Sequence, residues 1–157
     1  MAPMHGNARV DRQLSWSETF GVGHEALDNE HRRLIEAIND VCAACDGDGS
    51  KGALHALFAA LERETVKHFA HENTVMNEIF AGRSRKLPGE VKAMTGRAIK
   101  GHLAEHERNL ADLRKIMRAA EADSGCDLAQ TSAELKRWFL DHAVKYDSQL
   151  KAIFQAL

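Results

Sequence analysis

Seven residues that can ligate metal ions recur along this chain in four separate segments. Five are histidines and two are acids: His31, His68, Glu72, His102, His106, His142 and Asp147. Each falls inside the apolar stripe of a segment whose periodicity predicts a helix, where a polar group is unfavourable unless something satisfies it. The set is too large for one tetrahedral ion and large enough for two. The sequence therefore predicts a buried metal site.

The residue types in this set narrow the choice of metal. Imidazole suits iron, copper, nickel and zinc, whereas calcium and magnesium prefer oxygen ligands. None of the seven is a cysteine, which disfavours iron–sulfur chemistry. His68 and Glu72 are four residues apart, as are His102 and His106, and this spacing places both members of a pair on one helix face. Either pair alone is weak evidence for a metal site. Both pairs lie on apolar helix faces, however, and this strengthens the prediction.

The spacing of His142 and Asp147 does not fit a regular α-helix. They are five positions apart, and five steps of an ideal helix rotate the second residue by about 140° from the first. Both side chains can reach one site if the helix is locally widened. We therefore predict a π-type turn here, because such turns cluster at functional sites.

The elements that must position these residues are helices. Apolar residues at steps of three and four predict helices over residues 24–45, 51–80, 88–122 and 127–156. Short polar breaks between them favour an all-α, up-down-up-down four-helix bundle. Residues 1–23 are predicted to form an irregular N-terminal arm whose Trp16 and Phe20 lie against the bundle. We expect one domain over 1–157, with the bundle over 24–157.

Composition excludes several classes of protein. The 157 residues carry a net charge of −2 without a basic stripe, so we expect no nucleic-acid partner. No apolar run is long enough to span a bilayer and the first residues lack a secretory pattern, so we expect a cytoplasmic protein without a membrane partner.

Cys42 and Cys45 form a C-x-x-C without a preceding strand, which favours small core residues over a redox pair. Cys126 has no obvious partner.

The motifs around the seven residues resemble those of the hemerythrin family, in particular its bacterial single-domain members. The resemblance runs from Trp16 to beyond Asp147, which is nearly the whole chain. The matching segments are Phe20-Gly21-Val22-Gly23, Leu27-Asp28-Asn29-Glu30-His31, His68-Phe69-Ala70-His71-Glu72 with Met76, His102-Leu103-Ala104-Glu105-His106, and Trp138-Phe139-Leu140-Asp141-His142. An up-down helical bundle is known in this family, so the resemblance implies the same fold.

The resemblance also implies roles for these residues. It implies two irons joined by Glu72, Asp147 and an oxo or hydroxo group, with dioxygen at an open iron position. One iron would be held by His102, His106 and His142, and the other by His31 and His68. A dioxygen pocket would be lined by Phe69, Trp138 and Phe139.

The implied function is reversible dioxygen binding by a carrier, store or sensor, not by an enzyme. Two alternatives stay open: a di-iron redox enzyme such as a peroxidase or one that handles nitric oxide, and a regulatory module that reports oxygen or iron to a separate partner. We expect a monomer.

This chain departs from the family pattern at several positions. Asn73 stands where relatives often have a second Glu, and Phe139 where they often have Leu, so a bulkier ring could narrow the pocket. His71 could steady His68 or Glu72 from outside, or be a solvated helix residue. The stretch between Met76 and His102 is longer than usual. It could host a protein partner, although a tolerated insertion is the favoured interpretation.

Overall fold

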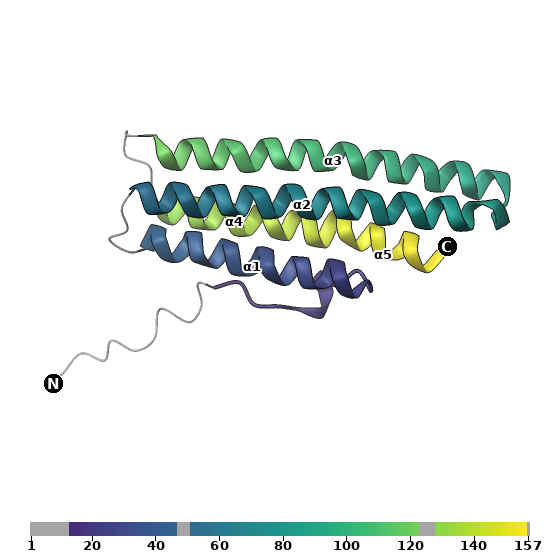
Figure 1. Ribbon diagram of the computed structural model, residues 1–157, viewed down its shortest axis with the longest axis horizontal. Helices are drawn as coiled ribbons and strands as arrows, with labels where there is room; N and C mark the ends of the chain where they lie inside the picture. The colour runs from purple at the N-terminus through teal and green to yellow at the C-terminus, as the bar shows by residue number, and fades with distance from the viewer. Residues whose placement is uncertain (1–12, 47–50, 123–127, 157) are drawn as a thin grey trace.

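The computed structural model describes residues 13–46, 51–122 and 128–156, and its helices confirm the all-α prediction (Figure 1). Helices α1, α2 and α3 lie alongside one another in alternating directions, and α4, η4 and α5 follow each other along a fourth rod. The elements are η2 (Glu18–Phe20), α1 (Glu25–Asp46), α2 (Lys51–Arg83), η3 (Ser84–Lys86), α3 (Gly89–Glu121), α4 (Leu128–Asp141), the π-helix η4 (His142–Tyr146) and α5 (Asp147–Ala156). No described helix is long and apolar enough to cross a membrane.

The predicted helix ends agree with the structure to within about three residues. The largest difference is the end of α2, which continues to Arg83 instead of stopping at residue 80. Ala81 and the exposed Gly82 remain helical, because one glycine weakens a helix by only about 1 kcal/mol and does not have to end it. Pro88 precedes the first residue of α3, where its missing N–H is no disadvantage. The breaks at 47–50 and 123–127, including Cys126, lie outside the described residues.

Two apolar clusters occupy the interior, and the seven candidate ligands lie between them along every helix. On α1, for example, Leu27 belongs to one cluster, Leu34 to the other, and His31 falls between them. The same order holds on the other rods, with a first cluster around Phe58, Leu61, Leu113, Leu135 and Phe139 and a second around Val75, Met76, Ile99 and Leu150. The site is therefore a polar layer with apolar packing on both sides, which keeps bulk water away from it.

The described part of the N-terminal arm packs on the bundle, as predicted for Trp16 and Phe20. Phe20 is buried and meets Phe139 edge to face at 5.5 Å between ring centroids. Trp16 packs on Phe20 in turn, at 6.2 Å. The side chain of Asn39 on α1 exchanges two hydrogen bonds with the backbone of Leu14, each 2.9 Å long. These two hydrogen bonds hold the arm against α1 at Asn39.

The predicted π-type turn is confirmed. The backbone N–H of Asp147 donates to the carbonyl of His142, five residues back instead of four. The wider turn returns Asp147 to the face that carries His142, and both side chains are buried. Without it, the five-residue spacing would direct one of the two side chains away from the interior.

Candidate metal centre

The carboxylate of Glu72 is fully buried and lies between two histidines of α3 and one histidine of its own helix, α2. Its Oε2 is 2.7 Å from Nε2 of His106 and 3.3 Å from Nε2 of His102, both on α3. Its Oε1 is 3.9 Å from Nε2 of His68, one turn earlier on α2. The two oxygens of Glu72 thus face two different groups of histidines.

Asp147 repeats this arrangement from the opposite wall. Its Oδ2 is 2.9 Å from Nε2 of His31. Its Oδ1 is 3.1 Å from Nε2 of His142 and 3.7 Å from Nε2 of His102. The two carboxylates therefore each present one oxygen to the His31 side of the site and the other to the His102 side.

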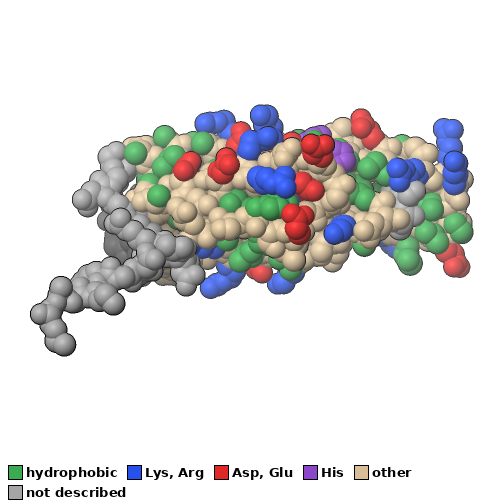
Figure 2. All heavy atoms as spheres, turned by 90° about the horizontal axis from the view of Figure 1, so that it is seen from below, with side chains coloured by type: hydrophobic (Ala, Val, Ile, Leu, Met, Phe, Trp, Pro, Cys, Tyr) green, Lys and Arg blue, Asp and Glu red, His purple; other side chains and the backbone are tan. Residues whose placement is uncertain are grey.

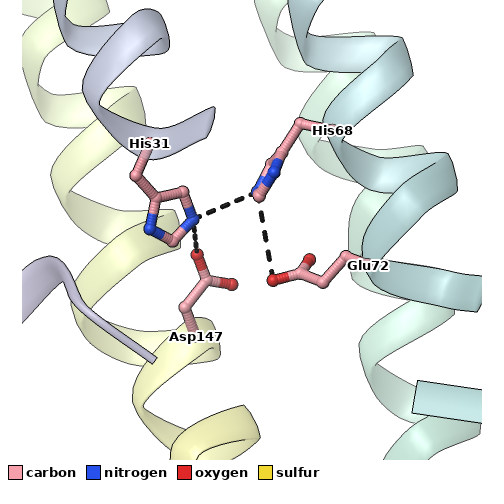
Figure 3. Close-up of side chains that lie close together, drawn as sticks. All are labelled: His31, His68, Glu72 and Asp147. Carbon is pink, nitrogen blue, oxygen red and sulfur yellow. Dashed lines mark hydrogen bonds and ion pairs between the residues drawn. The ribbon is translucent and has the colours of Figure 1, made fainter. Parts of the chain in front are cut away.

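The side chains on the His31 side converge on a small common space. Figure 3 shows His31 of α1, His68 and Glu72 of α2, and Asp147 of α5 pointing toward one another. The Nε2 atoms of His31 and His68 are 3.0 Å apart. One ligand atom from each of these four residues lies within 4.8 Å of the others, and Glu72 forms a second such group with His106 and His142.

Three of the five histidines are held in the tautomer that a metal ligand needs. Nδ1 of His31 lies 2.7 Å from the carbonyl oxygen of Phe20, and Nδ1 of His68 lies 2.8 Å from Oε2 of Glu30. Nδ1 of His106 lies 2.8 Å from Oδ1 of Asn73. Because each of these oxygens is an acceptor, the ring donates from Nδ1 and keeps the lone pair of Nε2 directed inward.

Several buried polar atoms at the centre lack a hydrogen bond to any described residue, although opposite charges lie nearby. They include Glu72 Oε1, His106 Nε2, His142 Nε2 and both Oδ atoms of Asp147. Native proteins rarely leave such atoms unsatisfied, and an ion is one explanation for them. A cation in the space between these atoms would satisfy their lone pairs. The residues therefore fit a metal.

Both carboxylates keep their charge despite complete burial. Burial and the negative charge of Asp147 act to raise the pKa of Glu72, but the imidazoles of His102 and His106 lower it to about 2. Burial also acts to raise the pKa of Asp147, but the neighbouring histidines, His142 foremost, hold it well below its usual value. Two ionised carboxylates in an apolar interior attract cations strongly, because the surroundings screen little.

The histidines respond to burial in two ways. For His31 and His142, burial acts to lower the pKa, but Asp147 outweighs it; the pKa of His31 rises to about 9 and that of His142 also rises. For His106 burial wins over Glu72, and its pKa falls. A metal ion would replace the protons on His31 and His142, since only neutral imidazole can ligate.

Glu30 is a contact of the site that sequence reasoning missed. Its carboxylate joins two histidines on α2, with Oε2 near His68 and Oε1 2.7 Å from Nδ1 of His71. His71 therefore acts on His68 through Glu30 and not by direct contact. The partner of His68 is a charged carboxylate, whereas the partner of His106 is the neutral amide of Asn73.

We expect the substitution Glu30→Gln to weaken metal binding by about 10- to 100-fold, the usual effect of losing a partner that orients a ligand. Glutamine keeps the size of the side chain but loses the charge that orients His68 and His71. The measurement is competition for the metal with a chelator of known affinity. Glu36→Gln on the exposed face of α1 is the matched control. Equal affinities of the two variants would contradict the role of Glu30.

The three aromatic residues predicted for a dioxygen pocket occupy different places. The ring of Phe139 stands perpendicular to that of His31, at 6.3 Å between centroids. Phe69 stacks parallel on His106 at 4.1 Å. Trp138 instead donates its indole N–H to the backbone oxygen of Asn109 on α3. Only Phe139 and Phe69 thus border the candidate ligands through their rings.

The interpretation of Cys42 and Cys45 as small core residues agrees with the structure. Both are buried in the apolar cluster that surrounds α1. Neither cysteine belongs to the groups of candidate metal ligands.

A helical bundle with an interior layer of histidines and carboxylates defines a class of cation-binding proteins. The chain belongs to the hemerythrin family: the pattern described as the hemerythrin HHE cation binding domain matches residues 22–154. The bacteriohemerythrin of Pseudomonas aeruginosa (strain LESB58) is 29% identical over 136 residues, covering 82% of this chain and 73% of that protein. The bacteriohemerythrin of Ralstonia nicotianae (strain ATCC BAA-1114 / GMI1000) is 29% identical over 138 residues, covering 87% and 85%.

Proposed function

We propose that this protein binds dioxygen reversibly at a pair of iron ions held by the seven buried residues. The observation that carries the proposal is the placement of Glu72 and Asp147, each of which presents its two oxygens to two different groups of histidines. This is the arrangement of a carboxylate that bridges two ions. The hemerythrin family and the bacteriohemerythrin name of the relatives support iron and dioxygen as the cofactor and ligand.

The proposed ligand sets differ in size. His102, His106 and His142 hold one iron, His31 and His68 hold the other, and the carboxylates serve both. When bound, the two ferrous ions supply the two electrons that dioxygen uptake takes and that its release returns. Because the His31 side has one histidine fewer, it leaves room for an additional ligand. Phe139 borders that side, where its ring meets the ring of His31 edge to face.

The surroundings favour binding over catalysis. Among the described residues, every fully buried acid and histidine belongs to the proposed ligand set. Glu30, the partly buried acid that contacts the site, is hydrogen-bonded to His68 and His71, which suits it to orienting His68 and not to acting as a general acid or base. The apolar clusters on both sides exclude water, which slows proton-driven loss of a bound ligand. With this proposal go the expectations of a single domain and a cytoplasmic monomer.

The decisive experiment loads the full chain with ferrous iron under nitrogen and counts the metal per chain. Dioxygen is then admitted while the charge-transfer absorption of the iron centre is recorded, and afterwards it is removed under vacuum. We expect two irons per chain and a band that appears with dioxygen and disappears without it. Irreversible oxidation with turnover of added peroxide would show a redox enzyme instead. Failure to hold two irons would overturn the proposal altogether.

We expect the substitution Phe139→Leu to release dioxygen faster, by up to about ten-fold, which corresponds to a barrier lowered by ~1.4 kcal/mol. Leucine removes the ring that stands against His31 and widens the path along it. The measurement is stopped-flow displacement of dioxygen from the loaded protein. Phe58→Leu is the control, because it removes a buried ring from the same apolar cluster. An unchanged rate in Phe139→Leu, or equal acceleration in both variants, would contradict a guarding role.

A further inference from the structure

The end of the molecule where α2 meets α3 projects beyond the start of α1 and the end of α5 (Figure 1). Six exposed basic residues lie on the hairpin of α2 and α3: Arg83, Arg85, Lys86, Lys92, Arg97 and Lys100. The first four lie at its projecting end, whereas Arg97 and Lys100 lie about 12 and 16 Å further along α3 from its first residue. We call Arg83, Arg85, Lys86 and Lys92 the basic tip. None of the six side chains forms an ion pair with another described residue, whereas Arg33 and Arg114 elsewhere pair with acids.

The charge of the tip is opposite to that of the rest of the chain. Residues 83–96 contain the four basic residues and one acid, Glu90, which gives a net charge of +3. Because the whole chain carries −2, the remainder carries −5. Charges more than about 8–10 Å away are largely screened at physiological salt. A surface in contact with the tip would therefore experience its positive charge and little of the negative remainder.

Apolar side chains accompany the cations on the tip. Met94 is 63% exposed and Val91 is 37% exposed, and they are three residues apart on α3. Figure 2 shows hydrophobic and basic side chains together at this end of the molecule. Phe80, the aromatic residue of this segment, is half-buried and lies over Gly96 within the hairpin. The outward surface thus combines cations with flexible apolar groups.

We infer that the basic tip binds the surface of an anionic lipid bilayer. Cations beside exposed apolar side chains suit such a surface, because the cations approach the headgroups while Met94 and Val91 enter the acyl boundary. A projecting end can also meet a flat surface without a clash from the rest of the bundle. Single-stranded nucleic acid fits less well, because its binding uses exposed aromatic rings for base stacking and Phe80 faces inward.

This inference departs from the sequence-based expectation of no membrane partner, which concerned segments that span the bilayer; binding at its surface is a different mode. It requires no long apolar helix, and it does not depend on the metal centre, which lies about 16 Å away along α2 between Glu72 and Arg83 at 1.5 Å per residue. Each Lys or Arg close to an anionic surface strengthens binding about five-fold. Four such residues acting by themselves give a reversible association that salt weakens.

The test measures co-sedimentation of the full chain with vesicles of phosphatidylcholine, either alone or mixed with phosphatidylglycerol. We expect binding to the anionic vesicles only, and loss of binding at 1 M salt, where screening shortens to about 3 Å. Arg85→Gln with Lys86→Gln should lower the partition coefficient by about 25-fold, since two cations are lost. Arg63→Gln with Lys67→Gln on α2 is the control with the same charge change, at an exposed place about 24 Å from Arg83.

Each result decides the inference. Binding that responds to the tip variant and not to the control supports it, and a further loss in Met94→Ser would show that apolar insertion contributes. No binding to anionic vesicles, equal binding to neutral ones, or equal loss in both double variants would overturn it. Tip-dependent binding to duplex DNA or polyglutamate without binding to vesicles would also overturn it, and would indicate a different acidic partner. None of these results depends on dioxygen binding.

Discussion

Replacing Glu72 with glutamine is expected to lower the iron content from two ions per chain to one or none. Glutamine has nearly the same size, but its neutral amide offers one oxygen where the carboxylate offers two. Glu72 faces His68 with one oxygen and His102 and His106 with the other. Its loss therefore weakens both proposed iron positions. Since outer contacts alone contribute about 10- to 100-fold to affinity, losing this ligand should exceed about 100-fold.

The measurement is iron per chain after anaerobic loading and gel filtration, together with the absorption of the oxidised centre. Glu107→Gln, an exposed acid on α3 next to His106 in sequence, is the matched control and should retain both irons. Circular dichroism of the metal-free variants shows whether the helices persist. If folded Glu72→Gln protein holds two irons with the affinity of the original protein, Glu72 does not bridge, and the proposed function loses its main support.

The helices and the candidate ligands could be predicted because both depend on local spacing. Apolar residues at steps of three and four define each buried face, and a histidine inside such a face is visible without coordinates. The π-helix η4 was predictable for the same reason, because His142 and Asp147 can share a face only if the turn between them is widened. In each case, the spacing of residues along one helix and their expected burial were enough to make the prediction.

Contacts between distant segments could not be predicted in this way. Glu30 and His68 are 38 positions apart, and no local pattern joins them. The acceptor of His31 is a backbone carbonyl, that of Phe20, and every residue of the chain has such a group. Which oxygen of Glu72 or Asp147 faces which histidine depends on the packing of all four rods. Side-chain type therefore identified candidates, whereas tertiary packing decides their partners.

The residues predicted for the dioxygen pocket also show that sequence position alone does not determine which groups a side chain contacts. Phe139 and Trp138 are neighbours in sequence, and the family resemblance placed both at the pocket. In the structure the ring of Phe139 meets His31, while the indole of Trp138 is directed to α3 by its hydrogen bond to Asn109. Adjacent helix positions point about 100° apart, which separates these two rings, whereas the neighbours His68 and Phe69 both border the candidate ligands.

The metal-free protein is expected to lose about 3 kcal/mol of stability as the pH rises from 6.5 to 9. The pKa of His31 is raised from 6.5 to about 9 in the folded state, because its ion pair with Asp147 outweighs the effect of burial. A group with a raised folded pKa contributes its full stabilisation below the unfolded pKa and loses it as the pH rises through the folded one. His142, whose pKa is also raised by Asp147, adds to the same loss.

The carboxylates give the opposite dependence at low pH. The pKa of Glu72 is lowered from 4.5 to about 2 by its histidine neighbours, against burial and the charge of Asp147. Asp147 is also lowered, from 3.8. Their stabilisation is present above the unfolded pKa values and is lost as the pH falls through the folded ones. The metal-free protein should therefore be most stable between about pH 4.5 and 6.5.

Bound metal should reverse the alkaline part of this profile. Because His31 must be neutral to ligate, metal uptake near pH 7 releases protons, and the affinity for metal rises as the pH approaches 9. Urea titrations of metal-free and loaded protein at several pH values should thus give slopes of opposite sign between pH 6.5 and 9. In the metal-free state, His31→Asn should flatten the alkaline loss, whereas His55→Asn at an exposed position of α2 should retain it. Parallel slopes for loaded and metal-free protein would mean that His31 keeps its proton when metal is present and is not a ligand.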